Sequence, residues 1–373
     1  MRTTVQPPRV HEPAPGGHHH DEELPQLAVR RQSLLAFAVF VVVAVGGLYF
    51  VLPQVAGLDD TWRRLERGDP WWLAAALAFT VLSFAGYVLL FQGVFVRAGS
   101  PIDLRASYQI TMAGLAATRI FAAGGAGGVV LTAWALRRSG MPPRAVADHT
   151  LAFLVLTYAV YMVALMVAGL GLYLGTFDGP APVGMTLVPA VLAAAAVALA
   201  LTLALVPPDL QRRLEGHVRG EGRVARLVQR AANAPAAFSA GVHEAWQHVR
   251  SRDPAMLGAI AFWAFNIAVL WAAFRAFGEA PAGAVIVTAY FVGMLGNLLP
   301  LPGGVGGVDG GMIAAFAAFG VDASLALVAV LTYRAFAFWL PTIPGAIAYF
   351  QLLRTVHRWR EERVGAAPAG VSG

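Results

Sequence analysis

The chain has 373 residues, of which 58% are hydrophobic and 13% charged, and its mean hydropathy is +0.63. Soluble domains carry about 25% charged residues, so this composition excludes an ordinary soluble globule and a disordered chain and indicates an integral membrane protein. All 27 basic residues are Arg and Cys is absent, which excludes a Walker A phosphate loop, a Schiff-base lysine and thiol chemistry. The net charge of +6 is spread over loops between apolar segments, which is typical of membrane orientation and not of nucleic-acid binding.

Apolar stretches of about 20 residues predict membrane-spanning helices. Residues 1–32 are polar and rich in Pro and Gly, and we interpret them as a disordered cytoplasmic tail; residues 351–373 form a second cytoplasmic tail. Between the tails, residues 33–350 form a single transmembrane domain. Its full spans are expected near 33–52, 70–96, 150–174, 183–206, 256–277 and 323–350.

Two further apolar stretches, near 106–136 and 282–320, are interrupted by glycine. Their arms have only about 10–18 residues, which is short for a crossing, so the pattern favours re-entrant helical hairpins. The interruptions hold Gly124, Gly125, Gly127 and Gly128 in the first stretch, and Pro300, Pro302, Gly303, Gly304, Gly306 and Gly307 in the second. The predicted fold is an all-α polytopic membrane protein with about six full spans and two hairpins.

Arginine counts orient this layout. We place the N-terminus in the cytoplasm and treat both interrupted stretches as re-entrant. The predicted inner segments then hold 21 Arg and the outer loops hold 4, as the positive-inside rule requires. Both termini are therefore expected in the cytoplasm. Two complete crossings by each interrupted stretch would give the same count, so that alternative stays open.

The two interrupted stretches resemble each other at an offset of 179 residues, where Gly114 meets Gly293 and the two GGxGG sequences coincide. Three full spans separate them, so the second copy is expected to be inverted. Inverted repeats with broken helices are an architecture of secondary transporters, with the substrate site at the repeat interface. The loop 207–253 carries apolar residues at helical spacing, which favours amphipathic helices on the inner leaflet; a solvated linker is the alternative.

Two arginines are predicted at membrane depth. Arg119 lies near the tip of the first hairpin and Arg334 about 11 residues into the last span. Intramembrane charges usually mark function, and a guanidinium suits a phosphate, which the backbone N–H groups after GGxGG would also bind. The alternative is structural, with each Arg paired to an acid or to backbone carbonyls. Asp309 could pair with one Arg, cap its own hairpin or carry a proton.

Other polar residues near the breaks are supporting candidates, namely Asn297, Tyr158 and Tyr333. Asp148 and His149 open a span at the predicted cytoplasmic face, where Asp is first of all a helix-start residue. The sequence contains no metal-binding or nucleophile motif, so we expect neither a cofactor nor a metal. A transporter is favoured over an enzyme, although an enzyme that acts on lipid-linked substrates can work with scattered polar residues and stays an alternative.

The segment NLLPLPGGVGGVDGGMIAAFAAFGV at 297–321 resembles the signature of the lysylphosphatidylglycerol synthase transmembrane region family, and the stretch from Arg119 through GGAGG looks like its first-half counterpart. This resemblance implies a protein of the bacterial inner membrane with paired hairpins around a lipid head-group cavity and, for the best-known members, lipid translocation. Asp309 stands where Glu is expected more often. No aminoacyl-transfer domain follows Gly373, so synthesis of lysylphosphatidylglycerol is not expected.

Together with the resemblance, these patterns predict a flippase that moves an anionic phospholipid or a polyprenyl-phosphate-linked lipid between leaflets. Its expected partners are membrane lipids, and a second copy of the chain in a homo-oligomer or a separate lipid-modifying enzyme is a further possible partner. Two other functions remain open. One is an integral enzyme that transfers a group on a lipid carrier, with Asp148 and His149 as its nearest acid–base candidates. The other is a scaffold whose 207–253 loop recruits a cytoplasmic partner.

Overall fold

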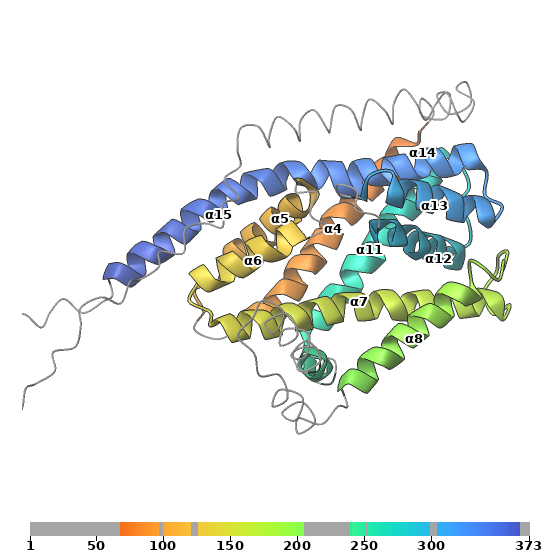
Figure 1. The fold of residues 1–373 in the computed structure, drawn as a ribbon. Coiled ribbons are helices and arrows are strands. Elements are labelled where there is room, and N and C mark those ends of the chain that lie inside the picture. Colours follow the sequence, from red (N-terminus) through yellow and green to blue (C-terminus); the bar gives the residue numbers. More distant parts are fainter. Residues whose placement is uncertain are drawn as a thin grey trace, which may run out of the picture. The chain divides into compact units, whose positions relative to one another are not determined.

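A computed structural model describes residues 68–96, 100–120, 126–204, 239, 241–248, 250, 253–298 and 304–365. Every regular element in these ranges is helical (Figure 1), which confirms the all-α prediction for this part of the chain. The helices are α4 (Pro70–Phe95), α5 (Leu104–Ile120), α6 (Ala126–Arg138), α7 (Pro143–Tyr173), α8 (Leu187–Ala204), α11 (Pro254–Phe277), α12 (Gly283–Met294), the 3₁₀ turn η1 (Leu295–Leu298), α13 (Gly307–Ala318), α14 (Ala323–Arg334), the π-helical segment η3 (Ala335–Trp339) and α15 (Leu340–Gly365).

Four helical stretches are long and apolar enough to cross a membrane: α4, α7, α11 and the continuous run Ala323–Glu362 through α14, η3 and α15. They match four of the six predicted full spans. The span predicted at 183–206 is the shorter apolar helix α8. The span at 33–52, the tail 1–32 and most of the loop 207–253 lie outside the described residues. The last helix continues to Gly365, beyond residue 350 where the sequence placed its membrane end.

Helices α4 and α11 pack against each other in antiparallel orientation (Figure 1). The N–H of Asp69, at the start of α4, donates to the carbonyl of Ala276, at the end of α11, over 2.9 Å. Glycines allow the two backbones to approach closely, since a Cβ added to Gly86 would lie 2.8 Å from the Phe262 nitrogen, and one added to Gly258 would overlap the backbone of Leu90. Small residues at such crossings are the usual device of membrane helices.

Helices α5 and α6 pack together, as do α12 and α13, and each pair is joined at the glycine-rich break. Glycines again set the contact, because a Cβ added to Gly128 would overlap Thr118 and one added to Gly293 would overlap Met312. The two pairs are called hairpin 1 (α5 and α6) and hairpin 2 (α12 and α13) below. Hairpin 1 packs on α15 and hairpin 2 on α7 and α14.

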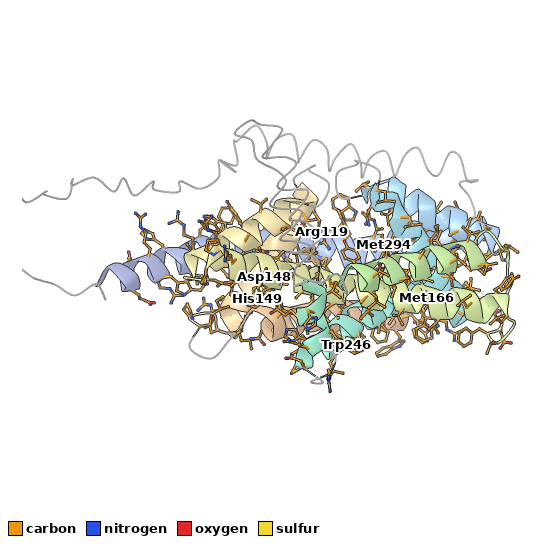
Figure 2. The ribbon with its side chains drawn as sticks, turned by 60° about the horizontal axis from the view of Figure 1, so that its bottom comes forward. Arg119, Asp148, His149, Met166, Trp246 and Met294 are labelled. Atoms are coloured by element: carbon orange, nitrogen blue, oxygen red, sulfur yellow. The ribbon has the colours of Figure 1, made fainter. Side chains whose placement is uncertain are left out.

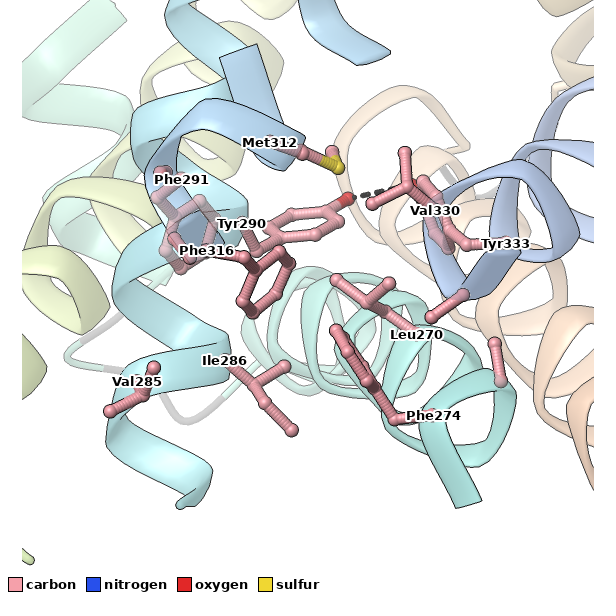
Figure 3. Packing of buried hydrophobic residues seen from close by; sticks show 14 of the residues in the cluster. Leu270, Phe274, Val285, Ile286, Tyr290, Phe291, Met312, Phe316, Val330 and Tyr333 are labelled. Atoms are coloured by element: carbon pink, nitrogen blue, oxygen red, sulfur yellow. Dashed lines mark hydrogen bonds between the residues drawn. The ribbon is translucent and has the colours of Figure 1, made fainter. Parts of the chain in front are cut away.

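The largest hydrophobic cluster surrounds hairpin 2 (Figure 3). Tyr290 of α12 and Phe316 of α13 are fully buried in it, and Phe274 of α11 packs edge-on against Phe316 with ring centroids 4.8 Å apart. The Tyr290 hydroxyl meets that of Tyr333 on α14 at 3.0 Å. Hairpin 2 is therefore held by both apolar contacts and a buried polar one.

Candidate functional site

Arg119 is the last but one residue of α5, at the tip of hairpin 1, and its side chain is buried. Its guanidinium reaches the last long helix, where Nη2 donates to the Ala337 carbonyl over 2.8 Å, and Nη1 donates to the Phe338 carbonyl and to the Thr342 hydroxyl. No carboxylate of the described residues lies within ion-pair distance of Arg119. Arg119 is thus a buried cation held by neutral groups.

The backbone around residue 338 explains why carbonyls are available to Arg119. Residues 335–339 form a π-helical segment, in which the Leu340 N–H bonds to the Ala335 carbonyl five residues earlier. Pro341 follows directly and has no N–H to give to the Ala337 carbonyl four residues before it. Since an unpaired backbone carbonyl is costly in a membrane, the Arg119 guanidinium supplies the missing donor.

Arg334 is the last residue of α14, directly before the π segment, and it pairs with hairpin 2. Its Nε lies 2.5 Å from Oδ1 of Asp309, and both side chains are at most 8% exposed. The other carboxylate oxygen of Asp309 accepts the Gly306 N–H over 2.9 Å and so caps the first turn of α13. Of the roles considered for Asp309, ion pairing and capping are both present in the structure.

Phe338 brings the two arginines to one place. The guanidinium carbon of Arg119 lies 4.6 Å from the centre of its ring and that of Arg334 lies 4.3 Å from it. The aromatic quadrupole offsets part of the cost of burying two cations side by side. Hairpin 1 thus reaches Phe338 through Arg119, and hairpin 2 is linked to the same helix through the Asp309–Arg334 ion pair. We call Arg119, Arg334, Asp309 and Phe338 the arginine cluster.

A chain of buried polar side chains runs from the arginine cluster toward α4. Tyr333, beside Arg334, contacts the Tyr290 hydroxyl and donates to Asn266 Oδ1 over 3.4 Å. Asn266 of α11 in turn donates to the hydroxyl of Ser83 on α4 over 2.5 Å. The predicted candidate Tyr333 thus belongs to a network that links four helices, and its hydroxyl has partners on both sides.

The remaining candidates near the breaks lie apart from the cluster contacts. In hairpin 1, Gly127 and Gly128 are buried in the first turn of α6. In hairpin 2, Gly304 and Gly306 have φ angles of +66° and +83°, which favour glycine. Gly307 begins α13. Asn297 is exposed beside Gly304, and Tyr158 is 54% exposed on α7. Gly124, Gly125, Gly303, Pro300 and Pro302 lie outside the described residues.

At the N-terminal end of α7, His149 is buried and its Nδ1 lies 2.5 Å from Oε1 of Glu244, in the helical segment 241–248 (Figure 2). Val242 and Ala245 of the same segment are also buried, whereas Trp246 is 58% exposed. The described part of the predicted amphipathic loop is therefore a helix docked on the bundle by one face. Asp148 is half-buried beside His149, and no group of three or more His and acidic side chains able to hold a metal ion occurs among the described residues.

The sequence analysis named both arginines and Asp309 as candidates but not Phe338, Thr342 and Pro341, which contact Arg119 or adjoin its partners. Phe338 gave no signal, because one Phe in an apolar span is ordinary. The signal that was available is Pro341, since proline inside a helix frees the carbonyl four residues earlier and a buried donor must then be found.

Residues 33–345 match the family model described as the lysylphosphatidylglycerol synthase TM region. The match covers well over half of the chain, so the chain belongs to this family, as the resemblance at 297–321 predicted. Similar relatives are UPF0104 membrane proteins of the archaeon Methanothermobacter thermautotrophicus, with 33% identity over 90 residues, 37% over 86 and 35% over 91. These alignments cover 23–24% of this chain and 26–27% of each relative, so the chain matches about a quarter of the length of these relatives.

Proposed function

We propose that this member of the family moves an anionic lipid between the leaflets of the plasma membrane and that the arginine cluster contacts the lipid phosphate. The observation that carries the proposal is Arg119, a buried guanidinium whose described partners are two carbonyls, a hydroxyl and an aromatic ring. A cation in a low-dielectric site is costly without an anion. A phosphate oxygen would serve it better than a carbonyl, because hydrogen bonds between charged groups are about twice as strong as neutral ones.

The charge of the cluster supports the same conclusion. It holds two guanidinium groups and one carboxylate, that of Asp309. An arriving phosphate adds negative charge where positive charge is in excess, and each guanidinium offers the planar pair of donors that fits two phosphate oxygens. The acyl chains would stay in the bilayer while the head group passes the cluster. Since the sequence has no Walker A motif, transport would be downhill or coupled to an ion.

An inverted repeat with two re-entrant hairpins is the membrane architecture that we propose for this transport. The halves begin alike, because α4 starts at Asp69-Pro70 and α11 at Asp253-Pro254, each with the Asp side chain accepting the N–H two residues on. These equivalent helices are antiparallel, as an inverted repeat requires. The hairpins also exchange partners, since α5 packs on α15 of the second half and α12 on α7 of the first.

Two residues that are equivalent at the offset of 179 residues each contact the opposite half of the chain. Met112 of α5 and Phe291 of α12 are equivalent at this offset. The Met112 carbonyl lies against Gly345 of α15, and the Phe291 carbonyl accepts a hydrogen bond of 2.7 Å from Tyr161 of α7. Together with the 21 inner and 4 outer arginines counted from the sequence, this arrangement supports cytoplasmic termini and hairpins that enter from opposite sides.

Leaflet exchange in reconstituted vesicles tests the proposal. The probe is phosphatidylethanolamine with a fluorescent label on its amine, which carries one negative charge, and external dithionite quenches the outward-facing fraction. A phosphate-free glycolipid with the same label is the control lipid. We expect the protein to accelerate exchange of the phospholipid and not of the glycolipid, and Arg119→Gln to abolish that acceleration.

Two results would overturn the proposal. Equal acceleration of both lipids would mean that the phosphate is not recognised. Unchanged exchange by Arg119→Gln protein, once it elutes as a single species in detergent, would remove Arg119 from the site.

A further inference from the structure

Helices α5 and α15 lie side by side (Figure 1), and a buried polar contact joins them near the open end of hairpin 1. The Thr355 hydroxyl donates to Gln109 Oε1 over 2.8 Å. Further along α5, Met112 lies against Gly345, which precedes Thr355 on α15. The two helices therefore run in opposite directions where they touch.

Two arginines flank this polar contact on the same side. Arg105 lies one turn before Gln109 and Arg358 one turn after Thr355, so in antiparallel helices both lie toward the open end of hairpin 1. Arg354 lies one turn before Arg358, and residues four apart are neighbours on a helix surface. All three arginines are exposed, and we call them the basic site.

The acids at this end of the two helices do not neutralise the basic site. Asp103 caps the start of α5, where its carboxylate accepts a backbone N–H over 2.7 Å. Glu361 lies 3.8 Å from His357. Glu362 is exposed, and no carboxylate of the described residues lies within ion-pair distance of an arginine of the basic site. Positive charge is therefore available there to an external anion.

The exposed face of α15 changes from apolar to basic at Arg354. On the side of the arginine cluster, this face carries Ile343, Ile347 and Phe350, each more than half exposed. Arg354 follows at the same helical spacing. These residues belong to a helix that is long and apolar enough to cross a membrane, and charged side chains near the end of such a helix extend to the head groups. The basic site therefore lies at head-group depth.

We propose that Arg105, Arg354 and Arg358 bind the phosphate of an anionic phospholipid in the adjoining leaflet. A guanidinium presents a planar pair of donors that fits two phosphate oxygens, and here the donors come from two helices. Arg105 and Arg119 are 14 residues apart on α5, about 21 Å at 1.5 Å per residue, so this site is distinct from the arginine cluster. The inference goes beyond the proposed function and does not depend on it, because a lipid can bind here whether or not one is moved.

The surface favours a lipid over a free phosphate ion because its basic and apolar parts are continuous. Exposed charge pairs in water are weak, so the arginines alone would hold a small anion poorly. A phospholipid adds the contact of its acyl chains with Ile347 and Phe350, directly beside the arginines. The same molecule therefore satisfies both parts of the surface.

Site-specific quenching in vesicles tests the proposal. The chain has no Cys, so Phe350→Cys provides a single site for a fluorophore one turn from Arg354. The quencher is a nitroxide near the top of an acyl chain, carried by phosphatidylglycerol or by phosphatidylcholine at a low mole fraction in unlabelled phosphatidylcholine. We expect the phosphatidylglycerol probe to quench more strongly. A fluorophore at Leu199 of α8, which is also exposed, should show no preference between the two lipids.

Charge-removing variants in the Phe350→Cys background identify the arginines. Arg105→Gln and Arg358→Gln should each lower the preference for phosphatidylglycerol by roughly fivefold, the effect of one arginine at an anionic membrane surface. Arg358→Lys keeps the charge and should keep most of the preference. The control combines Arg144→Gln with Arg250→Gln, which removes two exposed arginines near the starts of α7 and α11, and should leave the preference unchanged.

Three results would overturn the proposal. Equal quenching of the Phe350→Cys label by both probes would show that no anionic head group is selected there. An equal loss of preference in the control and in the Arg105→Gln/Arg358→Gln double variant would show attraction by the overall surface charge alone. Loss of the preference when inorganic phosphate replaces chloride at matched ionic strength would show a site for the free ion and not for a lipid.

Discussion

Neutralising Asp309 separates a structural role of the Arg334–Asp309 ion pair from a role in binding. Asp309→Asn keeps an oxygen to accept the Gly306 N–H but leaves the Arg334 guanidinium without the carboxylate 2.5 Å away. Because both side chains are at most 8% exposed, loss of one partner is expected to cost about 3–5 kcal/mol of unfolding free energy. Arg334→Met alone should cost a similar amount.

The double variant carries the decisive information. Arg334→Met with Asp309→Asn removes both charges together, and replacing a buried pair by uncharged groups is often close to neutral. We therefore expect the double variant to recover most of the stability that each single variant loses. Unfolding in mixed detergent micelles, followed by the fluorescence of the nine Trp residues, measures all three.

The control is Glu361→Gln, which breaks the exposed His357–Glu361 pair at 3.8 Å and should change stability by less than about 1 kcal/mol. Single losses that simply add in the double variant would refute the energetic coupling. Leaflet exchange by the stable double variant then decides the function: exchange at the wild-type rate would make Arg334 structural, and loss of exchange supports a phosphate contact.

Three further substitutions test the packing and the polar contacts. Gly258→Leu should lower the free energy of unfolding by about 1–3 kcal/mol or prevent folding, because it overpacks the α4–α11 crossing. The control Gly310→Ala, which has open space around its Cβ, should not destabilise the protein. Thermal unfolding measures both variants. Tyr333→Phe should cost about 1 kcal/mol by removing the hydroxyl between Tyr290 and Asn266, measured in detergent micelles. Glu244→Ala should release the helical segment from His149 and speed proteolysis near residues 241–248.

The helical content and the membrane spans could be predicted because they depend on local composition. A run such as that of α4 has no charged residue between Pro70 and Phe95, and length alone then implies a crossing. The interruptions between α5 and α6 and between α12 and α13 could be predicted for a similar reason, since glycine-rich sequences break the apolar arms there. The helix ends were predicted less well, as the continuation of α15 to Gly365 shows.

The contacts of the arginine cluster could not be predicted with the same certainty. The sequence placed Arg119 and Arg334 at membrane depth but left open whether each binds a phosphate, an acid or a carbonyl. The choice depends on which helix lies opposite, and hairpin 1 faces α15 of the other half of the chain. Phe338 lies in the π segment, and its ring contacts both guanidinium groups. No sequence pattern indicated this local geometry.

Pro341 provides the last test, because it links the π segment to Arg119. In Pro341→Ala protein, residue 341 regains an N–H that can bond to the Ala337 carbonyl, so the Arg119 guanidinium is no longer needed there. Arg119→Met should therefore destabilise Pro341→Ala protein less than it destabilises the wild type, by about 1.5–3 kcal/mol, the value of one hydrogen bond to a charged donor. Unfolding of the four proteins of this double-mutant cycle gives the difference. If Arg119→Met costs the same stability in both backgrounds, the hydrogen bond to the Ala337 carbonyl does not depend on Pro341. The other contacts of Arg119, with Phe338 and Thr342, would then account for its stabilising effect.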